Sequence, residues 1–429
     1  MNINEMISYI NEGKLDERLF EIYQTDAFVQ AQRARYTAAL NAFSDTFGGD
    51  GDIHIFSAPG RTEVCGNHTD HQHGEVLAAS ISDDAIAIVR ARSDSQVNLL
   101  SEGYDMISIS AETLDPDAAE EGTTKALIRG VLAKTKESGY TIGGFDAYVT
   151  SDVLSGSGLS SSAAFETILG SILSGLYNDM KIDPIRIAII GQYAENFYFG
   201  KPCGLMDQMA CSVGALCHID FADPSDPVVE RIDFSLTNAD YSLCITDTKG
   251  SHADLTPDYA AVPSEMKSVA AFFGKEILND VPLSDILDNA VNIREKCGDR
   301  ALLRAIHYHE ECSRVREAVT ALKEDRFGDF LDTIRRSGDS SFKYLQNVYP
   351  PHDLSKQNTS VALSISELTL KNAGDAGVCR IHGGGFAGTI QAFVRNDAVE
   401  TYREKMDKIF GEGACHVLLI RPHGGVQVI

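Results

Sequence analysis

The sequence predicts an α+β protein organised in two domains, and three observations support this fold class. The chain has 429 residues, which exceeds what one hydrophobic core usually organises. Segments that alternate like strands and segments with the three-to-four spacing of helices both occur along its length. The C-terminal part follows the order strand, strand, helix, strand. We place the boundary near residue 235, which gives an N-terminal domain 1–235 and a C-terminal domain 236–429.

The first domain is expected to combine helices and strands. Residues 1–50 carry apolar side chains at helical spacing and are expected to be helices. The segment DIHIFSAPGR is expected to be a strand that breaks at Pro59-Gly60, and VLAASI, AIAIVRAR, VNLLSE and FDAYVTSDV are expected to be further strands. Helices are expected over KALIRGVLAKTKESG, after the Gly/Ser-rich segment LSGSGLSSS, and from Pro184, with Asp183 as its N-cap.

The second domain begins with helices and ends with mixed elements. Residues 290–370 are dominated by amphipathic segments such as RALLRAIHYHEECSRVREAVTALKE. The strands AGVCRI and TIQAFV, the helix DAVETYREKMDKIFG and the strand CHVLLIRP follow. These last four elements give the strand, strand, helix, strand order.

The charge and the cysteine pattern exclude several classes of function. With 62 acidic and 37 basic residues, the net charge of -25 argues against nucleic acid or an anionic membrane as a partner. No apolar run approaches the ~18 residues of a membrane span, and the first residues lack the pattern of a signal peptide. The nine cysteines are scattered without a CxxC pair, which favours reduced thiols and a cytoplasmic protein.

A Gly/Ser-rich loop before an apolar helix is the most informative local feature. Gly156 and Gly158 allow the backbone to approach a ligand, and Ser160, Ser161 and Ser162 open the helix. A helix N-terminus flanked by glycines is a favourable site for an anion. An ordinary serine-capped helix is the alternative. The chain has no GxxxxGK[ST] loop, so a nucleotide would be held in another way.

Two further motifs have structural alternatives that the sequence leaves open. GGGFAG matches GxGxxG at Gly383, Gly385 and Gly388, but a strand rather than a helix is expected after it, which excludes a Rossmann fingerprint and leaves a tight turn. In FGKPCGLMDQMAC, Asp207 lies in an apolar setting and needs a partner such as an arginine or a substrate hydroxyl. A capping or surface Asp is the alternative.

The segment GRTEVCGNHTDHQHG gathers imidazoles, a carboxylate and an arginine. His68, Asp70, His71 and His73 lie within six positions, a density that is typical of metal sites. The order HxDHxH differs from the HxHxDH of binuclear metallo-hydrolases, and a second cluster of ligands would still be needed. A metal site and a turn with surface histidines are both alternatives to a site that binds substrate.

Taken together, these motifs resemble those of the galactokinases in the GHMP kinase superfamily. The first family signature, approximately GRxNxIGEHTDYxxGxVLPxAI, is similar to GRTEVCGNHTDHQHGEVLAASI. The second signature is similar to GSGLSSSAA, and AENFYFGKPCGLMDQ resembles the stretch that joins a magnesium-binding Glu to the catalytic Asp. RIHGGGFAG stands in place of the third signature. The matches extend from about residue 53 to the C-terminus, and the helical first 50 residues are longer than the family usually has.

The resemblance implies roles in phosphoryl transfer for the matching positions. Asp207 would be the base that takes the proton from the anomeric hydroxyl, and Arg61 would hold it ionised and stabilise the transferring phosphoryl group. Ser162 and Glu195 would be ligands of Mg²⁺. The phosphates of ATP would be held by Gly156, Ser157, Gly158, Leu159, Ser160, Ser161 and Ser162.

The resemblance also implies a set of residues that bind the sugar. They are Asn67, His68, Thr69, Asp70 and Tyr259. Two of the signature positions differ from the family, because Asn67 stands where the family has Glu and His71 where it has Tyr. The family Glu contacts the sugar 6-hydroxyl. An amide at this position still binds a hydroxyl but no longer repels a 6-carboxylate. Relatives that act on galacturonate also lack the Glu.

The function expected from the resemblance is that of an ATP- and Mg²⁺-dependent sugar-1-kinase. Galactose is the first candidate substrate, and galacturonate or another C6 variant is the alternative. A metallo-hydrolase and a non-catalytic sugar sensor are the competing classes. The implied fold is the two-domain GHMP architecture, an S5-like domain and a ferredoxin-like domain with the site between them. We expect a monomer whose partners are the sugar and ATP.

Overall fold

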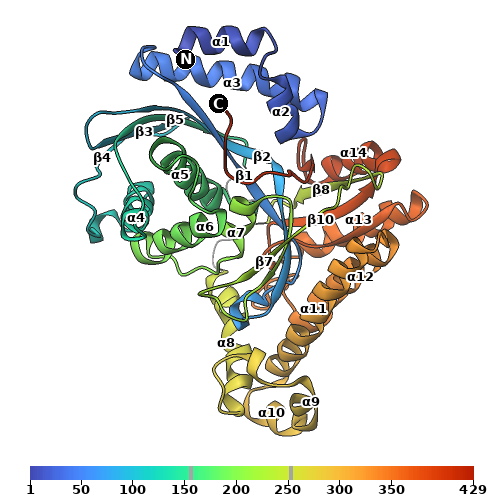
Figure 1. Cartoon of the computed structure of the whole chain (residues 1–429). Coiled ribbons are helices and arrows are strands. Elements are labelled where there is room, and N and C mark those ends of the chain that lie inside the picture. Colours follow the sequence, from blue (N-terminus) through green and yellow to red (C-terminus); the bar gives the residue numbers. More distant parts are fainter. Residues whose placement is uncertain (154–157, 251–254) are drawn as a thin grey trace.

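The computed structural model describes residues 1–153, 158–250 and 255–429, and Figure 1 shows their arrangement. Two sheets and fourteen named α-helices make up this described part, which confirms the predicted α+β class. The boundary near residue 235 stays a prediction. The strands are β1 (His54–Cys65), β2 (Glu75–Ala91), β3 (Gln96–Ser101), β4 (Ile107–Ser110), β5 (Phe145–Ser151), β6 (Leu216–Asp220), β7 (Val228–Ile232), β8 (Tyr241–Asp247), β9 (Gly377–Ile381), β10 (Thr389–Arg395), β11 (Cys415–Leu418) and β12 (Val426–Gln427).

Helices surround both sheets. They are α1 (Ile3–Asn11), α2 (Asp16–Tyr23), α3 (Asp26–Phe47), α4 (Thr124–Glu137), α5 (Ser161–Asn178), α6 (Pro184–Tyr193), α7 (Met206–Val213), α8 (Thr256–Phe272), α9 (Leu283–Asp288), α10 (Ala290–Lys296), α11 (Asp299–Lys323), α12 (Phe327–Ser340), α13 (Asn358–Asn372) and α14 (Val399–Phe410). Two π-helical turns, η3 (Ala194–Phe199) and η5 (Ser341–Leu345), continue α6 and α12. Asp183 caps α6 through Ile185 N, as the sequence predicts.

The larger sheet has eight strands in the order β12-β1-β2-β5-β3-β4, with β6 paired to β2 and β7 to β6. Its pairs are antiparallel except β3 with β5. Adjacent residues of β1 face opposite sides, so Ile55 packs among α1–α3 whereas Phe56 packs among α4–α6. Figure 1 shows these two helical layers on the two faces of the sheet. The first 50 residues are therefore a covering layer of this sheet.

Two expectations about β1 and β2 are wrong. β1 does not break at Pro59-Gly60 but continues to Cys65, and VLAASI and AIAIVRAR belong to one long strand, β2. The register between β1 and β2 shifts between Pro59 and Arg61. A β-bulge of this kind accommodates a proline, which cannot donate to the ladder, without ending the strand.

The smaller sheet has four antiparallel strands in the order β11-β8-β10-β9. The predicted order strand, strand, helix, strand is confirmed as β9, β10, α14 and β11. A shared apolar core joins the two sheets, because Leu77 and Ile81 of β2 belong to the same buried cluster as Leu243 of β8 and Phe393 of β10. This packing fixes the site residues of one sheet relative to those of the other.

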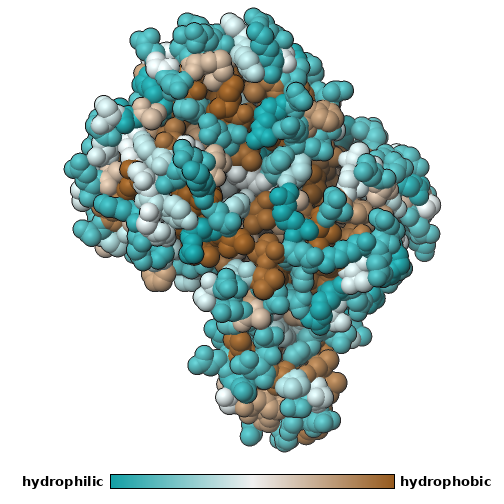
Figure 2. Space-filling model, viewed as in Figure 1, coloured by the Kyte–Doolittle hydropathy of each residue, from teal (hydrophilic) through white to brown (hydrophobic). Residues whose placement is uncertain are grey.

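The helices α8, α9 and α10, with the adjoining end of α11, extend away from the two sheets (Figure 1). In the same view, hydrophilic residues cover most of the periphery, and the hydrophobic residues that reach the surface gather in the middle of the face (Figure 2). Within the described residues, we find no helix with both the length and the apolar character needed to span a lipid bilayer.

Candidate active site

A buried ion pair between β1 and α7 forms the centre of the site. Arg61 follows the bulge in β1, and Asp207 lies in the first turn of α7. Arg61 Nε donates to Asp207 Oδ1 at 2.7 Å, and Nη2 donates to Oδ2 at 2.8 Å. Such a two-pronged contact fixes both the position and the plane of the carboxylate. The Arg61 side chain is 7% exposed, whereas that of Asp207 is 35% exposed and so accessible to a ligand.

The surroundings of Asp207 favour its ionised form. Burial raises the pKa of its carboxyl, but the charge and hydrogen bonds of Arg61 and the hydroxyl of Ser160 outweigh burial, and the net shift is downward. Ser160 Oγ donates to Asp207 Oδ2, and Arg61 Nη1 donates to the carbonyl of Gly158. The carboxylate is therefore an accessible anion with a fixed orientation at neutral pH.

The N-terminus of α5 meets this pair directly. Ser160, the N-cap residue, has a left-handed backbone conformation. Its hydroxyl donates to Asp207 and does not cap the helix. Gly60 of β1 permits the contact, because an added Cβ would lie 2.9 Å from the carbonyl oxygen of Leu159. The first N–H groups of an α-helix have no partner within the helix. The predicted phosphate residues Gly156 and Ser157 lie outside the described residues.

The predicted magnesium ligands lie together beside α5. Ser162 Oγ, in the first turn of α5, is 3.4 Å from Glu195 Oε1, and Lys201 Nζ contacts the same oxygen at 2.8 Å. Glu195 lies on η3, the π-helical turn that continues α6. Gln208 donates to Glu195 Oε2 at 2.8 Å and to Glu166 Oε2 at 3.0 Å. These oxygens are of the type that Mg²⁺ prefers.

The turn after β1 presents His68 and Asp70. His68 Nε2 donates to the carbonyl of Gly384 at 2.9 Å, which leaves Nδ1 as the acceptor of the ring. Burial lowers the pKa of His68 to about 4, so the ring is neutral at pH 7. Asp70 packs directly against Gly204, where an added Cβ would overlap its Oδ2. The turn and the segment before Asp207 are thus in contact.

Thr69 and Asn67 are enclosed by protein in this structure. Thr69 is fully buried, and its hydroxyl, which has one hydrogen to donate, lies 2.9 Å from the carbonyl oxygen of Gly66 and 2.7 Å from that of Glu75. Asn67 is also fully buried, with an amide that contacts four protein groups. Through these contacts both side chains hold the turn, and their predicted contact with the sugar stays a prediction.

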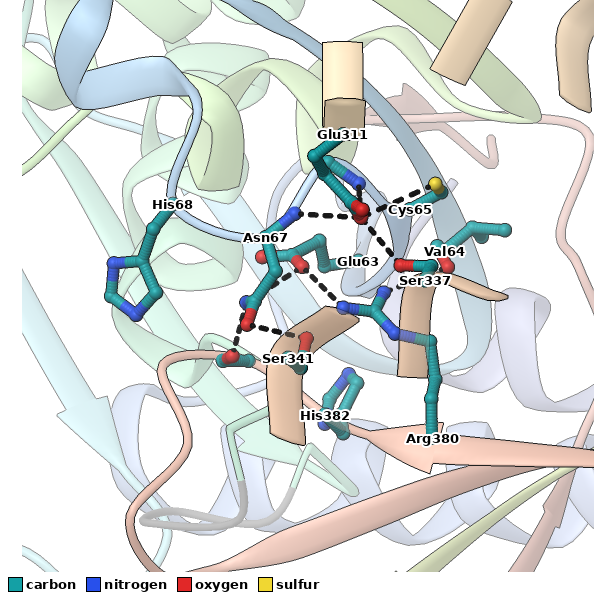
Figure 3. Close-up of polar contacts among 12 residues, drawn as sticks. Glu63, Val64, Cys65, Asn67, His68, Glu311, Ser337, Ser341, Arg380 and His382 are labelled. Atoms are coloured by element: carbon teal, nitrogen blue, oxygen red, sulfur yellow. Dashed lines mark hydrogen bonds and ion pairs between the residues drawn. The ribbon is translucent and has the colours of Figure 1, made fainter. Parts of the chain in front are cut away.

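A buried carboxylate of α11 supports the turn from behind, as Figure 3 shows. Glu311 Oε1 accepts from Gly66 N at 3.0 Å and from Asn67 N at 3.4 Å, and Ser337 donates to the same oxygen. Arg314 Nε donates to Glu311 Oε2 at 2.7 Å. Burial alone would raise the pKa of Glu311, but the neighbouring cations hold it well below its usual range. Residues of α11 and α12 thereby shape the turn after β1, although they lie far from it in the sequence.

The GGGFAG segment is a hairpin connection between β9 and β10, which agrees with the predicted tight turn. Gly383 and Gly385 have positive φ angles of 63° and 81°. The connection also receives the turn after β1, because Gly383 O accepts from Asn67 and Gly384 O accepts from His68. Tyr259 of α8 donates its hydroxyl to Gly385 O at 2.8 Å. The predicted sugar-binding residues His68 and Tyr259 therefore meet at one loop.

The histidines of HTDHQH do not converge. His71 is 39% exposed in its side chain, and its ring centroid is 6.0 Å from that of His68. Across the ranges 1–153, 158–250 and 255–429, no group of three or more His, Cys, Asp or Glu side chains is arranged to hold a metal ion.

Several residues that line the site were not predicted from the sequence. Lys201, Glu166 and Gln208 surround Glu195, and Glu63 contacts Asn67. Lys201 and Gln208 lie inside the motif that contains Glu195 and Asp207, so that motif itself pointed to them. Glu63 lies between Arg61 and His68 in the first signature, where its charge was the available clue.

The comparisons with known proteins agree with this fold. The "GHMP kinases N terminal domain" family model matches residues 126–215, and the "Galactokinase galactose-binding signature" matches residues 41–91. Solved structures with a similar fold include Lactococcus lactis galactokinase complexed with galactose, with a TM-score of 0.76 at 23% identity over 92% of this chain and 100% of that one. Methanococcus jannaschii mevalonate kinase has a TM-score of 0.57 at 13% identity over 86% of this chain and 99% of that one. The fold is that of the GHMP kinases.

Curated relatives define the family more closely. The galactokinase of Streptomyces coelicolor is 30% identical over 83% of this chain and 88% of its own length. The galactokinase of Glaesserella parasuis is 31% identical over 84% of this chain and 90% of its own length. The chain belongs to the galactokinase family. This confirms the class of enzyme that the sequence motifs predict, a sugar kinase.

Proposed function

We propose that this protein transfers a phosphoryl group from ATP to the anomeric hydroxyl of galactose. The observation that carries the proposal is the two-pronged contact between Arg61 and Asp207 beside the N-terminus of α5. It combines an ionised, accessible base with a fixed cation next to a helix terminus that favours anions. The named galactokinase relatives support galactose as the sugar.

Asp207 is the group that accepts the proton of the reacting hydroxyl. Its low pKa keeps it ionised before the reaction, and Arg61 and Ser160 hold both of its oxygens in place. Arg61 remains charged throughout and stabilises the negative charge that develops on the transferred group. Phosphoryl transfer depends mainly on such positioning and charge stabilisation, which this arrangement supplies.

The residues around Glu195 fit a magnesium ion. Glu166 Oε1 and Gln208 Oε1 are buried without a hydrogen-bond partner, which marks unused oxygen ligands or hydrogen-bond acceptors next to Glu195. Ser162 and Glu195 would hold the ion, which would supply positive charge to neutralise the phosphates of ATP. Lys201 contacts Glu195 Oε1 at 2.8 Å and would supply a further positive charge beside the ion.

The sugar would lie between Asp207 and the turn after β1. His68 Nδ1 is an acceptor and Asp70 is a carboxylate, and hydroxyl-rich ligands require several such groups in fixed directions. Tyr259 closes the opposite side through the hairpin between β9 and β10. We further infer a cytoplasmic monomer with domains 1–235 and 236–429.

Release of ADP, measured with a coupled assay across a panel of hexoses and uronic acids, tests the proposal. We expect Mg²⁺-dependent ADP release with galactose and none without sugar. A purified protein that releases no ADP with any sugar of the panel would exclude a sugar kinase. Stoichiometric zinc that is lost on mutation of His71 and His73 would instead support a metallo-hydrolase.

A further inference from the structure

Glu63 is a buried carboxyl group that the mechanism described above does not use. Its side chain is 5% exposed and lies on β1 between the reactive pair and the sugar-binding turn. Oε1 accepts from Asn67 Nδ2 at 2.9 Å and contacts Arg380 Nη2 at 3.4 Å (Figure 3). Oε2 has no hydrogen-bond partner within the described ranges. It is also not completely enclosed by protein atoms. This oxygen therefore has unused hydrogen-bonding capacity and a small exposed surface.

The electrostatic neighbours of Glu63 place it at the site. Burial raises the pKa of its carboxyl to about 7, Arg380 and Arg61 oppose this rise, and Asp70 adds to it. Arg61 belongs to the reactive pair and Asp70 to the sugar-binding turn. Glu63 is therefore close enough to both residues for their charges to act on its carboxyl.

Asn67, in contrast, has no hydrogen-bonding capacity left for a ligand. Its Nδ2 donates to Glu63 and to Gly383 O at 2.7 Å, and its Oδ1 accepts from Asn347 Nδ2 at 2.7 Å and lies 3.5 Å from Ser341 Oγ. An amide has two donor hydrogens and one acceptor oxygen. Asn67 therefore holds Glu63 and the hairpin between β9 and β10 rather than facing the sugar.

The two residues exchange places relative to the family pattern quoted above. Where GRxNxIGEHTDY has Asn and then Glu four positions later, this chain has Glu63 and then Asn67. Glu63 and Asn67 contact each other directly. Because of this contact, exchanging the two residues leaves one carboxyl and one amide side chain side by side, as in the family pattern. The site has kept its carboxyl group but holds it from β1.

We propose that Glu63 determines the sugar specificity of the kinase, by accepting a hydroxyl of a neutral sugar through Oε2 and by repelling sugars that carry a carboxylate. This inference rests on the proposed kinase function. The guanidinium groups nearby are already engaged, Arg61 by Asp207 and Arg380 by Val64 O at 2.9 Å and by Glu63 itself. A uronic acid would therefore bring an uncompensated negative charge next to Glu63.

The test compares kcat/KM for galactose and galacturonate in the wild type and in Glu63→Gln. At pH 8, where Glu63 with its pKa of about 7 is mostly ionised, we expect the wild type to prefer galactose by at least about 100-fold, because like charges at close range in a partly desolvated site are strongly unfavourable. Glu63→Gln should raise the KM for galactose about tenfold, the loss of one hydrogen bond to a charged group. Glu63→Gln should also reduce the preference for galactose over galacturonate. Its effect on kcat should be smaller than its effect on the KM for galactose.

The matched control is Glu120→Gln, which neutralises another buried carboxylate paired with an arginine, Arg129. It should leave the preference unchanged. The double variant Glu63→Asn with Asn67→Glu restores the family order and should phosphorylate galactose better than either single variant.

Three outcomes would contradict the proposal. They are equal use of both sugars by the wild type, an unchanged preference in folded Glu63→Gln, and a double variant no better than the single ones. The first needs no variant to fold. Absence of ADP release with every sugar would instead refute the kinase function itself.

Discussion

Asp207 accepts three hydrogen bonds, two from Arg61 and one from Ser160, and this determines what its replacement should do. In Asp207→Asn the size of the side chain is conserved, but the amide cannot accept a proton, offers Arg61 one acceptor oxygen instead of two and no longer balances its charge. We expect kcat to fall at least ~100-fold, the usual effect of losing a general base, while the Kd for the sugar changes much less. Steady-state kinetics and calorimetric sugar binding measure the two effects. Asp179→Asn, at an exposed position, is the control. Near-normal kcat in a folded Asp207→Asn would place the base elsewhere.

Glu63 also gives the protein a characteristic dependence of stability on pH. The pKa of its carboxyl is about 7 in the folded protein, compared with 4.5 for a glutamate without these surroundings, as in the unfolded chain. Between these two pH values the folded protein therefore binds the proton more tightly than the unfolded chain does. The free energy of unfolding should then fall as the pH rises from about 4.5 through 7.

Glu63→Gln removes this titration. Urea unfolding of both proteins from pH 5 to pH 8 should show the wild type losing stability relative to Glu63→Gln as the pH rises. His68, whose pKa is lowered to about 4, is present in both and cancels in the comparison. A constant difference between the two proteins would show that Glu63 is ionised throughout this range.

At the scale of elements, the segment before α7 connects the turn after β1, which carries Asp70, with Asp207 and its partner Arg61. Gly204 lies against Asp70, and its backbone conformation is open to other residues. In Gly204→Ala the new methyl group must displace the Asp70 carboxylate. We expect the KM for the sugar to rise about tenfold through a misdirected hydrogen bond, with KM for ATP unchanged. Gly328→Ala, where an added Cβ meets nothing within 4 Å, is the control. Unchanged kinetics in Gly204→Ala would argue against a sugar contact by Asp70.

Element type and order were predictable because they depend on local patterns. The Asp183-Pro184 start of α6 and the terminal β9, β10, α14, β11 order follow from capping residues and hydrophobic periodicity. The continuation of β1 through Pro59 was not predictable, because a bulge against β2 depends on the partner strand. The π-helical turn that carries Glu195 has no sequence pattern of its own.

The site was predictable to the extent that motifs identify residues by type. Arg61 with Asp207, and Ser162 with Glu195, lie together as the resemblance implies. The burial of Asn67 was not predictable, because its partners come from residues as distant as Asn347 and Gly383. Which side chains saturate one another is a property of the tertiary structure.

At the scale of the whole molecule, Asp84 joins the N-terminal helices, the larger sheet and the C-terminal segment. Its side chain is fully buried in β2. Tyr23 of α2 donates to it at 2.6 Å, Arg35 of α3 at 2.5 Å, and Arg421 after β11 at 2.8 Å. Burial raises the pKa of Asp84, but the two arginines outweigh it and the net shift is downward. The first 50 residues are therefore fastened to the rest of the protein by a shared buried anion.

Asp84→Asn should therefore destabilise the whole protein. The substitution leaves Arg421 fully buried without its carboxylate and leaves Arg35 with Asp152 as its remaining partner, and breaking a buried ion pair in this way costs about 3–5 kcal/mol. Tyr23→Phe, which removes one hydrogen bond from the same group, should cost only about 1–3 kcal/mol. A carboxyl whose pKa is lower in the folded protein than in the unfolded chain stabilises the fold above the unfolded-chain pKa, and this stabilisation is lost as the pH falls. The wild type should therefore lose its advantage in stability over Asp84→Asn on acidification below about pH 4. Urea unfolding at several pH values measures both effects. Equal stability of wild type and Asp84→Asn at pH 7 would show that the N-terminal helices are held by their apolar contacts alone.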